Sequence, residues 1–313
     1  MGNALVHLEI TPRILSGVSD ATRFLGQYEG QRCALKPGVK REHFLMNLHG
    51  NLALEGNTLS TSQLKGVHRG EKVGAMESEL VQARAFLAAY ERSEHFSAVN
   101  KKDLLTAYLL MQEGRPLGPM DQNVSAEVWN ARMKESLELV DVLFRYIEDE
   151  KLTHPIVKAA VFHFQLFHIR PFERTNDAVA RLWHRLLLGR FHRLFFYAPF
   201  ELLLKQNQQA YVDAMGQANT HDSQQRFIEF SLQQVVISLK MVLESLDNRH
   251  QRVDDRLAFA KMHFGGGRLT RKKYMSLFQN IGPATASRDL KTGLDAGMLT
   301  RMGHKARTEY CFV

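Results

Sequence analysis

Apolar residues recur at helical spacing through most of the first 250 residues, and strand-like alternation of apolar and polar residues is scarce there. Strong helix formers fill many of the positions between them. Ser125 stands where one of these segments needs an N-cap. The clearest amphipathic segments are 77–92, 124–150, 154–169, 177–191 and 224–246. The pattern predicts a mainly α-helical body.

The pattern changes near the C-terminus, where the Gly-rich segment 264–270 marks the clearest break. Thr270 can cap a short helix that follows. A turn then places Pro283 at the first position of a second helix, which Gly297 can close. Two short strands around a basic turn at 303–307 are expected next. This order of elements predicts a small winged helix-turn-helix of mixed α and β structure.

The composition is that of an ordinary globular chain of 313 residues, with 44% hydrophobic and 24% charged residues. No apolar run approaches the roughly 20 residues that a membrane span needs. The first residues lack the pattern of a secretory signal, and Val6 stands where a myristoylation signal needs Ser or Thr. Cys33 and Cys311 provide no disulfide framework. We therefore expect a cytoplasmic protein without a membrane partner.

The net charge of +8 is confined to the C-terminal end. From Arg256 onward there are 11 Lys and Arg against 3 Asp and Glu, which gives the full +8, while the preceding 255 residues carry 30 of each sign. A neutral body with a basic end favours a polyanionic partner, most plausibly nucleic acid. The alternative is a basic surface that binds no partner.

The second C-terminal helix predicts an apolar face and a polar face. Ala286, Leu290 and Leu294 are spaced to face inward. The donors expected to contact DNA bases or phosphates lie on the opposite face, beside the helix N-terminus and in the basic turn: Thr285, Ser287, Arg288, Lys291, Thr292, Lys305 and Arg307. The string ATASRDLKTGLDAGML resembles the recognition helix of winged-helix repressors. Asp289 and Asp295 weaken the DNA hypothesis, and the alternative is a winged helix used for protein contacts or dimerisation.

The segment 154–183, HPIVKAAVFHFQLFHIRPFERTNDAVARLW, resembles the signature of the Fic (Fido) family. Family members typically have a helix A-x-x-H-x-x-F-E-x-I-H-P-F followed by the loop [D/E]-G-N-G-R-x-x-R. The residues that fall in register are Ala159, Ala160, His163, Ile169, Pro171, Phe172, Asn176 and Arg181. The segments 51–67, 196–215 and 226–235 are similar to the family's inhibitory helix and to the helices after the loop. The resemblance implies a Fic helical bundle followed by a winged helix.

The resemblance also implies chemistry, because family enzymes transfer AMP from ATP to a hydroxyl. Arg170 stands at the position of the catalytic base, and a guanidinium remains protonated at neutral pH. Arg174 stands at the position of the acid that holds Mg²⁺. Thr175 and Asp177 replace both glycines of the phosphate loop, and Ala178 replaces its first arginine. These replacements predict a degenerate loop with no catalytic residue.

Two further features of the family bear on this prediction. Glu55 and Arg181 match the two halves of the inhibitory pair, with Asn51 in place of its Ser or Thr, and we expect them to tie the N-terminal region to the core. The alternative is that Glu55 is a surface acid. The segment 113–129 is too short for the family's target-binding flap. A nucleotide, if bound at all, would contact Asn176 and Arg181.

Several histidines lie around the signature and are candidates for a substitute base or for metal ligands. His168 lies two residues before Arg170, which corresponds to about 200° around a helix, so we expect it to point away from the loop. His163, His168, His184 and His192 lack the spacing of metal ligands, so no metal site is expected. They are expected to be hydrogen-bonded or solvated.

The sequence therefore favours a DNA-binding transcriptional regulator built on a Fic fold, a pseudo-enzyme that needs no cofactor and is compatible with a homodimer. The alternative is a noncanonical nucleotidyl- or phosphotransferase that still binds ATP and Mg²⁺. The expected organisation is an N-terminal helical region at 1–95 with the inhibitory motif, a Fic-like core at 96–250 and a winged helix-turn-helix at 251–313.

Overall fold

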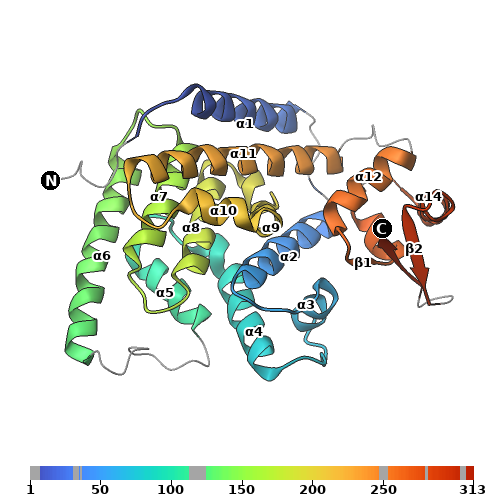
Figure 1. Ribbon diagram of the computed structural model, residues 1–313, viewed down its shortest axis with the longest axis horizontal. Helices are drawn as coiled ribbons and strands as arrows, with labels where there is room; N and C mark the ends of the chain where they lie inside the picture. The colour runs from blue at the N-terminus through green and yellow to red at the C-terminus, as the bar shows by residue number, and fades with distance from the viewer. Residues whose placement is uncertain are drawn as a thin grey trace. The chain divides into compact units, whose positions relative to one another are not determined.

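The computed structural model describes residues 8–30, 35, 37–112, 125–246, 253–278, 281–303 and 308–313. The chain groups into two compact units. One contains Met1–Leu25 and Phe44–Leu239, and the other contains Gly26–His43 and Lys240–Val313. Both are mainly helical, which confirms the predicted fold class (Figure 1). Among the described residues, no helix is both long and apolar enough to cross a membrane.

The helices up to residue 246 follow the amphipathic segments of the sequence. In chain order, the elements are α1 (Pro12–Gly30), α2 (Pro37–Leu54), α3 (Thr61–His68), α4 (Glu77–Arg92), η1 (Ser93–His95), α5 (Lys101–Met111), α6 (Ala126–Asp149), α7 (Pro155–Ile169), α8 (Asn176–Phe191), η2 (Arg193–Phe196), α9 (Phe200–Gln206), α10 (Gln208–Met215) and α11 (His221–Leu246).

Helices α7 and α8 form the centre of the first unit. They pack against each other, and α6 and α5 pack against α7 and α8 respectively. Eleven consecutive residues of α7, from Ile156 to Leu166, are buried, which explains why its apolar residues surround the whole helix instead of forming one stripe. In α8, the buried set includes the charged residues Arg181 and Arg185. The loop between these two helices therefore lies over a core that contains polar groups.

Local capping chemistry fixes several helix starts. The Ser125 side chain accepts a hydrogen bond from the Val128 N–H, as its position in the sequence predicted. Ser60 and Gln63 form a reciprocal capping box at α3. Asn100 caps α5 by accepting from the Lys102 N–H. These bonds satisfy N–H groups that have no partner inside the helix.

The C-terminal part of the second unit has the two helices and the hairpin that the sequence predicted, together with one further helix, α12, and one further strand, β1. Its elements are α12 (Val253–Phe264), β1 (Arg268–Leu269), α13 (Arg271–Ser276), α14 (Pro283–Asp295), β2 (Leu299–Met302) and β3 (Glu309–Phe312). The three strands pair antiparallel in the order β1-β3-β2. Thr270 caps α13, Pro283 begins α14, and Gly297 follows α14 in a left-handed conformation with φ 69°. This small sheet is consistent with a winged helix.

The inward face of α14 differs from the predicted one by a rotation. Ala286 and Leu290 are buried as expected, but Leu294 is half-buried, and Asp289 and Gly293 belong to the buried face. A side chain at position 293 would collide with Leu299, since a Cβ built there would lie 2.8 Å from its Cδ1. The buried stripe thus runs at i, i+3, i+4 and i+7, with a carboxylate in it.

Candidate functional site

The loop between α7 and α8 is held in an unusual backbone conformation. Arg170 ends α7 with φ 48°, and Thr175 precedes α8 with φ 54°; among the described residues, these are the two non-glycine positions with positive φ. A β-branched residue rarely adopts this conformation, so Thr175 is strained by about 1–3 kcal/mol. Its hydroxyl accepts a 2.7 Å hydrogen bond from Gln112 Nε2, which helps to hold it there.

Asn176 closes the loop on itself. Its Oδ1 accepts a hydrogen bond from the Phe172 N–H at 2.9 Å, and its Nδ2 donates to the Phe172 carbonyl. The Phe172 ring is buried and stacks on Tyr108, with ring centroids 4.1 Å apart. Both polar ends of the Asn176 amide are therefore engaged by the backbone of its own loop.

The charged residues of the loop are two guanidinium groups and two carboxylates. Arg170 Nη1 lies 3.2 Å from Asp177 Oδ1 in a pair that is partly exposed. Arg174 Nε and Glu173 Oε1 are buried atoms without a hydrogen-bond partner in the structure. Among the described residues, no three His, Cys, Asp or Glu side chains gather as a metal site. Mg²⁺ prefers a shell of oxygen ligands. The loop has two cations, and Arg170 already pairs with one of its two carboxylates, Asp177, so it does not fit such a shell.

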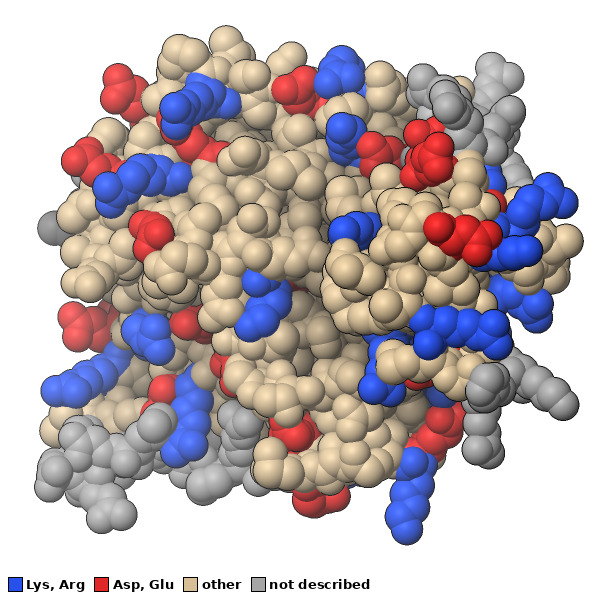
Figure 2. Space-filling model, turned by 45° about the vertical axis from the view of Figure 1, so that its right-hand side comes forward, with Lys and Arg blue, Asp and Glu red and all other residues tan. Residues whose placement is uncertain are grey.

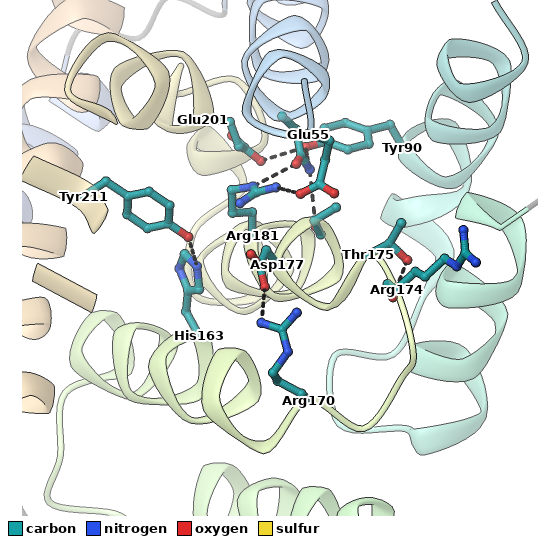
Figure 3. A network of polar contacts seen from close by, with 12 residues as sticks. Glu55, Tyr90, His163, Arg170, Arg174, Thr175, Asp177, Arg181, Glu201 and Tyr211 are labelled. Carbon is teal, nitrogen blue, oxygen red and sulfur yellow. Dashed lines mark hydrogen bonds and ion pairs between the residues drawn. The ribbon is translucent and has the colours of Figure 1, made fainter. Parts of the chain in front are cut away.

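Arg181 lies at the centre of a buried polar core beside the loop (Figure 3). Its Nε donates to Asn51 Oδ1 at 2.8 Å, and its Nη2 forms an ion pair with Glu55 Oε1. The side chain of Arg181 is 2% exposed, and that of Glu55 is 19% exposed. Burial by itself lowers the pKa of Arg181, but the neighbouring Tyr211 hydroxyl and the Glu55 carboxylate more than offset this and raise it above its ordinary value. The structure thus brings Glu55 and Arg181 together.

A second carboxylate belongs to the same polar core. Asn51 Nδ2 donates to the Tyr90 hydroxyl at 2.7 Å, and that hydroxyl donates to Glu201 Oε1 at 3.1 Å (Figure 3). Glu201 is completely buried, and burial raises its pKa although Arg185 opposes the shift. A chain of hydrogen bonds therefore links Arg181, on α8, to the start of α9.

The histidines near the loop are part of the packing. His168 Nε2 lies 3.2 Å from the Met215 carbonyl, so its ring faces α10, away from the loop. His163 Nε2 lies 3.1 Å from the Tyr211 hydroxyl, and burial lowers the pKa of His163 well below its ordinary value. Both ring nitrogens of His184 are buried without a hydrogen-bond partner in the structure, and burial lowers its pKa to about 3. His184 is thus a neutral residue packed against the Phe200 ring, and neither hydrogen-bonded nor solvated.

Comparison with known proteins identifies the family to which this arrangement belongs. Residues 108–188, which contain α7, the loop and most of α8, match the model of the Fic/DOC family. The chain contains a Fic family domain. Curated relatives named protein adenylyltransferase Fic are 27% identical over 207 residues in Culex quinquefasciatus and 24% identical over 224 residues in Aedes aegypti. These matches cover 60% and 66% of this chain, and the chain spans about two fifths of the length of each relative.

Solved structures show the same fold. A Fic family protein from Desulfovibrio desulfuricans G20 superposes with a TM-score of 0.67 at 23% identity and covers 98% of this chain, with 97% of its own length matched. Residues 134–508 of Fic-1 from C. elegans superpose with a TM-score of 0.55 at 18% identity, covering 74% of this chain and 71% of that one. The Fic fold thus extends well beyond the family signature.

The second unit carries the residues predicted to contact DNA. Arg288, Lys291 and Ser287 are exposed on α14, and Thr285 is half-exposed at its first turn. The Thr292 hydroxyl donates to the Arg288 carbonyl of its own helix. Lys305 and Arg307 lie outside the described residues. Figure 2 shows Lys and Arg side chains gathered toward the right-hand edge of the view, with fewer Asp and Glu side chains between them.

Asp289 does not face the same way as these cations. Its two carboxylate oxygens accept hydrogen bonds of 2.6 Å from Arg256 Nε and Nη2, and the Tyr274 hydroxyl donates to it at 3.1 Å. Asp289 is 1% exposed. Asp289, which weakened the DNA hypothesis, is therefore neutralised inside the unit. Asp295 is the one acidic side chain that remains exposed on the described part of α14.

Sequence reasoning missed several of these residues. The contact of Tyr90 with Glu201 extends the polar core around Arg181, and the contact of Arg256 with Asp289 neutralises the buried carboxylate of α14. In both contacts the two residues lie far apart in sequence. A buried Asp in an apolar helix stripe does predict that some cation pairs with it. Nothing local indicates which cation it is.

Proposed function

We propose that this chain is a DNA-binding regulator whose Fic domain does not transfer AMP. The observation that carries this proposal is the outward face of α14, where Arg288 and Lys291 are exposed and form no ion pair with a described carboxylate, while Asp289 is withdrawn into the interior. Uncompensated cations on a helix of this size are suited to phosphates and to the base edges of a major groove.

The arrangement of the second unit supports the same proposal. Helices α13 and α14 pack against each other, and β2 and β3 form a hairpin after α14. In winged helix-turn-helix proteins, the second helix of the pair lies in the major groove while the first crosses the backbone. Here the second helix is α14, on which Arg288 and Lys291 are exposed.

The loop of the Fic domain supports the absence of transfer. Arg170, at the position of the family's base, cannot accept a proton and is paired with Asp177. Asn176 is bonded to its own loop, and Arg181 is bonded to Asn51 and Glu55. The described loop residues do not fit Mg²⁺. The function of the Fic domain would then be that of a scaffold for the DNA-binding unit.

Two assays on the full chain test the two halves of the proposal. A mobility-shift assay with a pool of random duplexes should show a retarded complex that weakens steeply with salt. Incubation with radiolabelled ATP and Mg²⁺ should label neither the protein nor a cell lysate. Glu55→Gly, which removes the carboxylate from Arg181, should remain equally inactive. Labelling by Glu55→Gly that disappears in Glu55→Gly/Arg181→Ala would overturn the loss of transfer, and the absence of any retarded complex would overturn DNA binding.

A further inference from the structure

The side chain of Arg271 lies against the outward face of α14. Arg271 is the first residue of α13, and its Nη1 donates a 3.1 Å hydrogen bond to Ser287 Oγ. Both residues are exposed. Ser287 precedes Arg288 and lies one helical turn before Lys291, so the guanidinium of Arg271 joins the face that those two cations occupy.

This contact has a consequence for the freedom of the arginine. A free Arg side chain has about 2 kcal/mol of rotamer entropy, part of which is lost when it binds an anion. The Ser287 hydroxyl holds one edge of the guanidinium, and the other edge of its donor fork stays available. The side chain is thereby ordered before a ligand arrives.

Among the described residues, no carboxylate neutralises the charge of Arg271. Among the described residues of the C-terminal segment, Arg256 pairs with Asp289 and Arg268 pairs with Glu309. Arg271 forms no ion pair with a described carboxylate. An ordered guanidinium that no described carboxylate neutralises is suited to a phosphate diester.

We infer that Arg271 is a phosphate-contacting residue of the DNA interface and that Ser287 is its positioning residue and not a reader of bases. This inference rests on the proposed function and assigns roles within the same surface. It commits Arg271 to the DNA backbone because α13, the first helix of the pair, is the one that crosses the backbone. It also reverses the expectation that Ser287 contacts DNA itself.

The test uses the full chain and a fluorescent random-sequence DNA duplex, with affinity measured by anisotropy across a salt series. Arg271→Ala should reduce the slope of log affinity against log salt by about 0.9, the value for one phosphate contact. Between about 50 and 200 mM salt, the wild type should therefore lose roughly 3-fold more affinity than the variant does. Circular dichroism checks that each variant is folded.

A double-mutant cycle separates positioning from direct contact. Ser287→Ala should weaken binding in the wild type and have no effect in the Arg271→Ala background. The matched control is Lys272→Ala, the exposed cation next in sequence, in which the effect of Ser287→Ala should persist unchanged.

The outcomes distinguish this inference from the function on which it rests. Strict additivity of Ser287→Ala and Arg271→Ala, with wild-type binding intact, would overturn the inference alone. So would a Ser287→Ala variant that loses affinity for a selected site but keeps its affinity for random duplexes, since Ser287 would then read a base. If the wild type binds no duplex, the proposed function and the inference both fall.

Discussion

Arginine side chains of the two units differ in burial and in ion pairing. Arg181 is 2% exposed and bonded to Asn51 and Glu55, so its charge is neutralised within the core of the Fic domain. Arg288 is exposed on α14 and forms no ion pair with a described carboxylate. A guanidinium that is ion-paired within its own protein contributes to stability. One that has no ion-pair partner is available to bind a ligand. The Arg181 guanidinium is therefore occupied by groups of its own protein, and the Arg288 guanidinium remains available to a ligand.

The buried ion pair of Arg181 and Glu55 predicts the largest effect, which is on stability. Arg181→Ala removes the ion-pair partner of Glu55 and one hydrogen-bond partner of Asn51, and breaking a buried pair in this way costs about 3–5 kcal/mol. The free energy of unfolding can be measured by urea titration. The double variant Glu55→Ala/Arg181→Ala should lose less than the sum of the two single variants. Additive and small losses would show that the pair contributes nothing to the fold.

The exposed cations of α14 predict the next largest effect, which is on DNA affinity and not on stability. Arg288→Glu/Lys291→Glu should weaken binding to a random duplex by at least about 100-fold, because two attractive charges become repulsive. The matched control is Lys102→Glu/Lys134→Glu, which makes the same change of charge at exposed positions of the first unit. Equal weakening by both variants would indicate a non-specific effect of net charge. The cations of α14 would then have no special role in binding DNA.

The buried core should also give a smaller, pH-dependent effect. Burial lowers the pKa of His184 to about 3 from an ordinary value of 6.5. Between these two pH values, His184 is protonated in the unfolded chain but neutral in the folded chain. Stability is therefore complete above pH 6.5 and falls as the pH decreases toward 3, by up to about 1.4 kcal/mol per pH unit.

Replacing the buried imidazole should remove this dependence. Urea titrations of His184→Phe should show a shallower decrease of stability with falling pH than those of the wild type. The buried Trp183 provides a fluorescent signal from the same helix. The exposed His95→Gln is the control and should keep the wild-type slope. An unchanged slope in His184→Phe would show that this residue is protonated without cost.

The sequence predicted the features that depend on local chemistry. The helix 77–92, the Ser125 cap, Pro283 at the start of α14 and Gly297 after it are all present. Each depends on the intrinsic preference of one residue or on regular spacing. The Fic signature likewise indicated the family, because it joins residues of one continuous segment.

The features that the sequence did not predict depend on long-range contacts. Asp289 was expected to weaken DNA binding, but it is buried because Arg256, 33 residues earlier, neutralises it. Leu294 was expected inside, yet the buried Asp289 and the close approach of Leu299 to Gly293 rotate the helix. The strand β1 has two residues and is defined only by its pairing with β3. A partner distant in sequence leaves no local pattern from which to predict it.

Arg288 is the residue through which α14 would recognise a DNA sequence. A preferred site would first be selected from random duplexes with the full chain, and the affinities of the wild type and Arg288→Ala would then be compared on that site and on random DNA. If α14 reads base edges, the variant should lose about 1–3 kcal/mol on the selected site, roughly 5- to 150-fold, and little on random DNA. An equal loss on both, or the selection of no site, would contradict the account of this chain as a sequence-specific regulator.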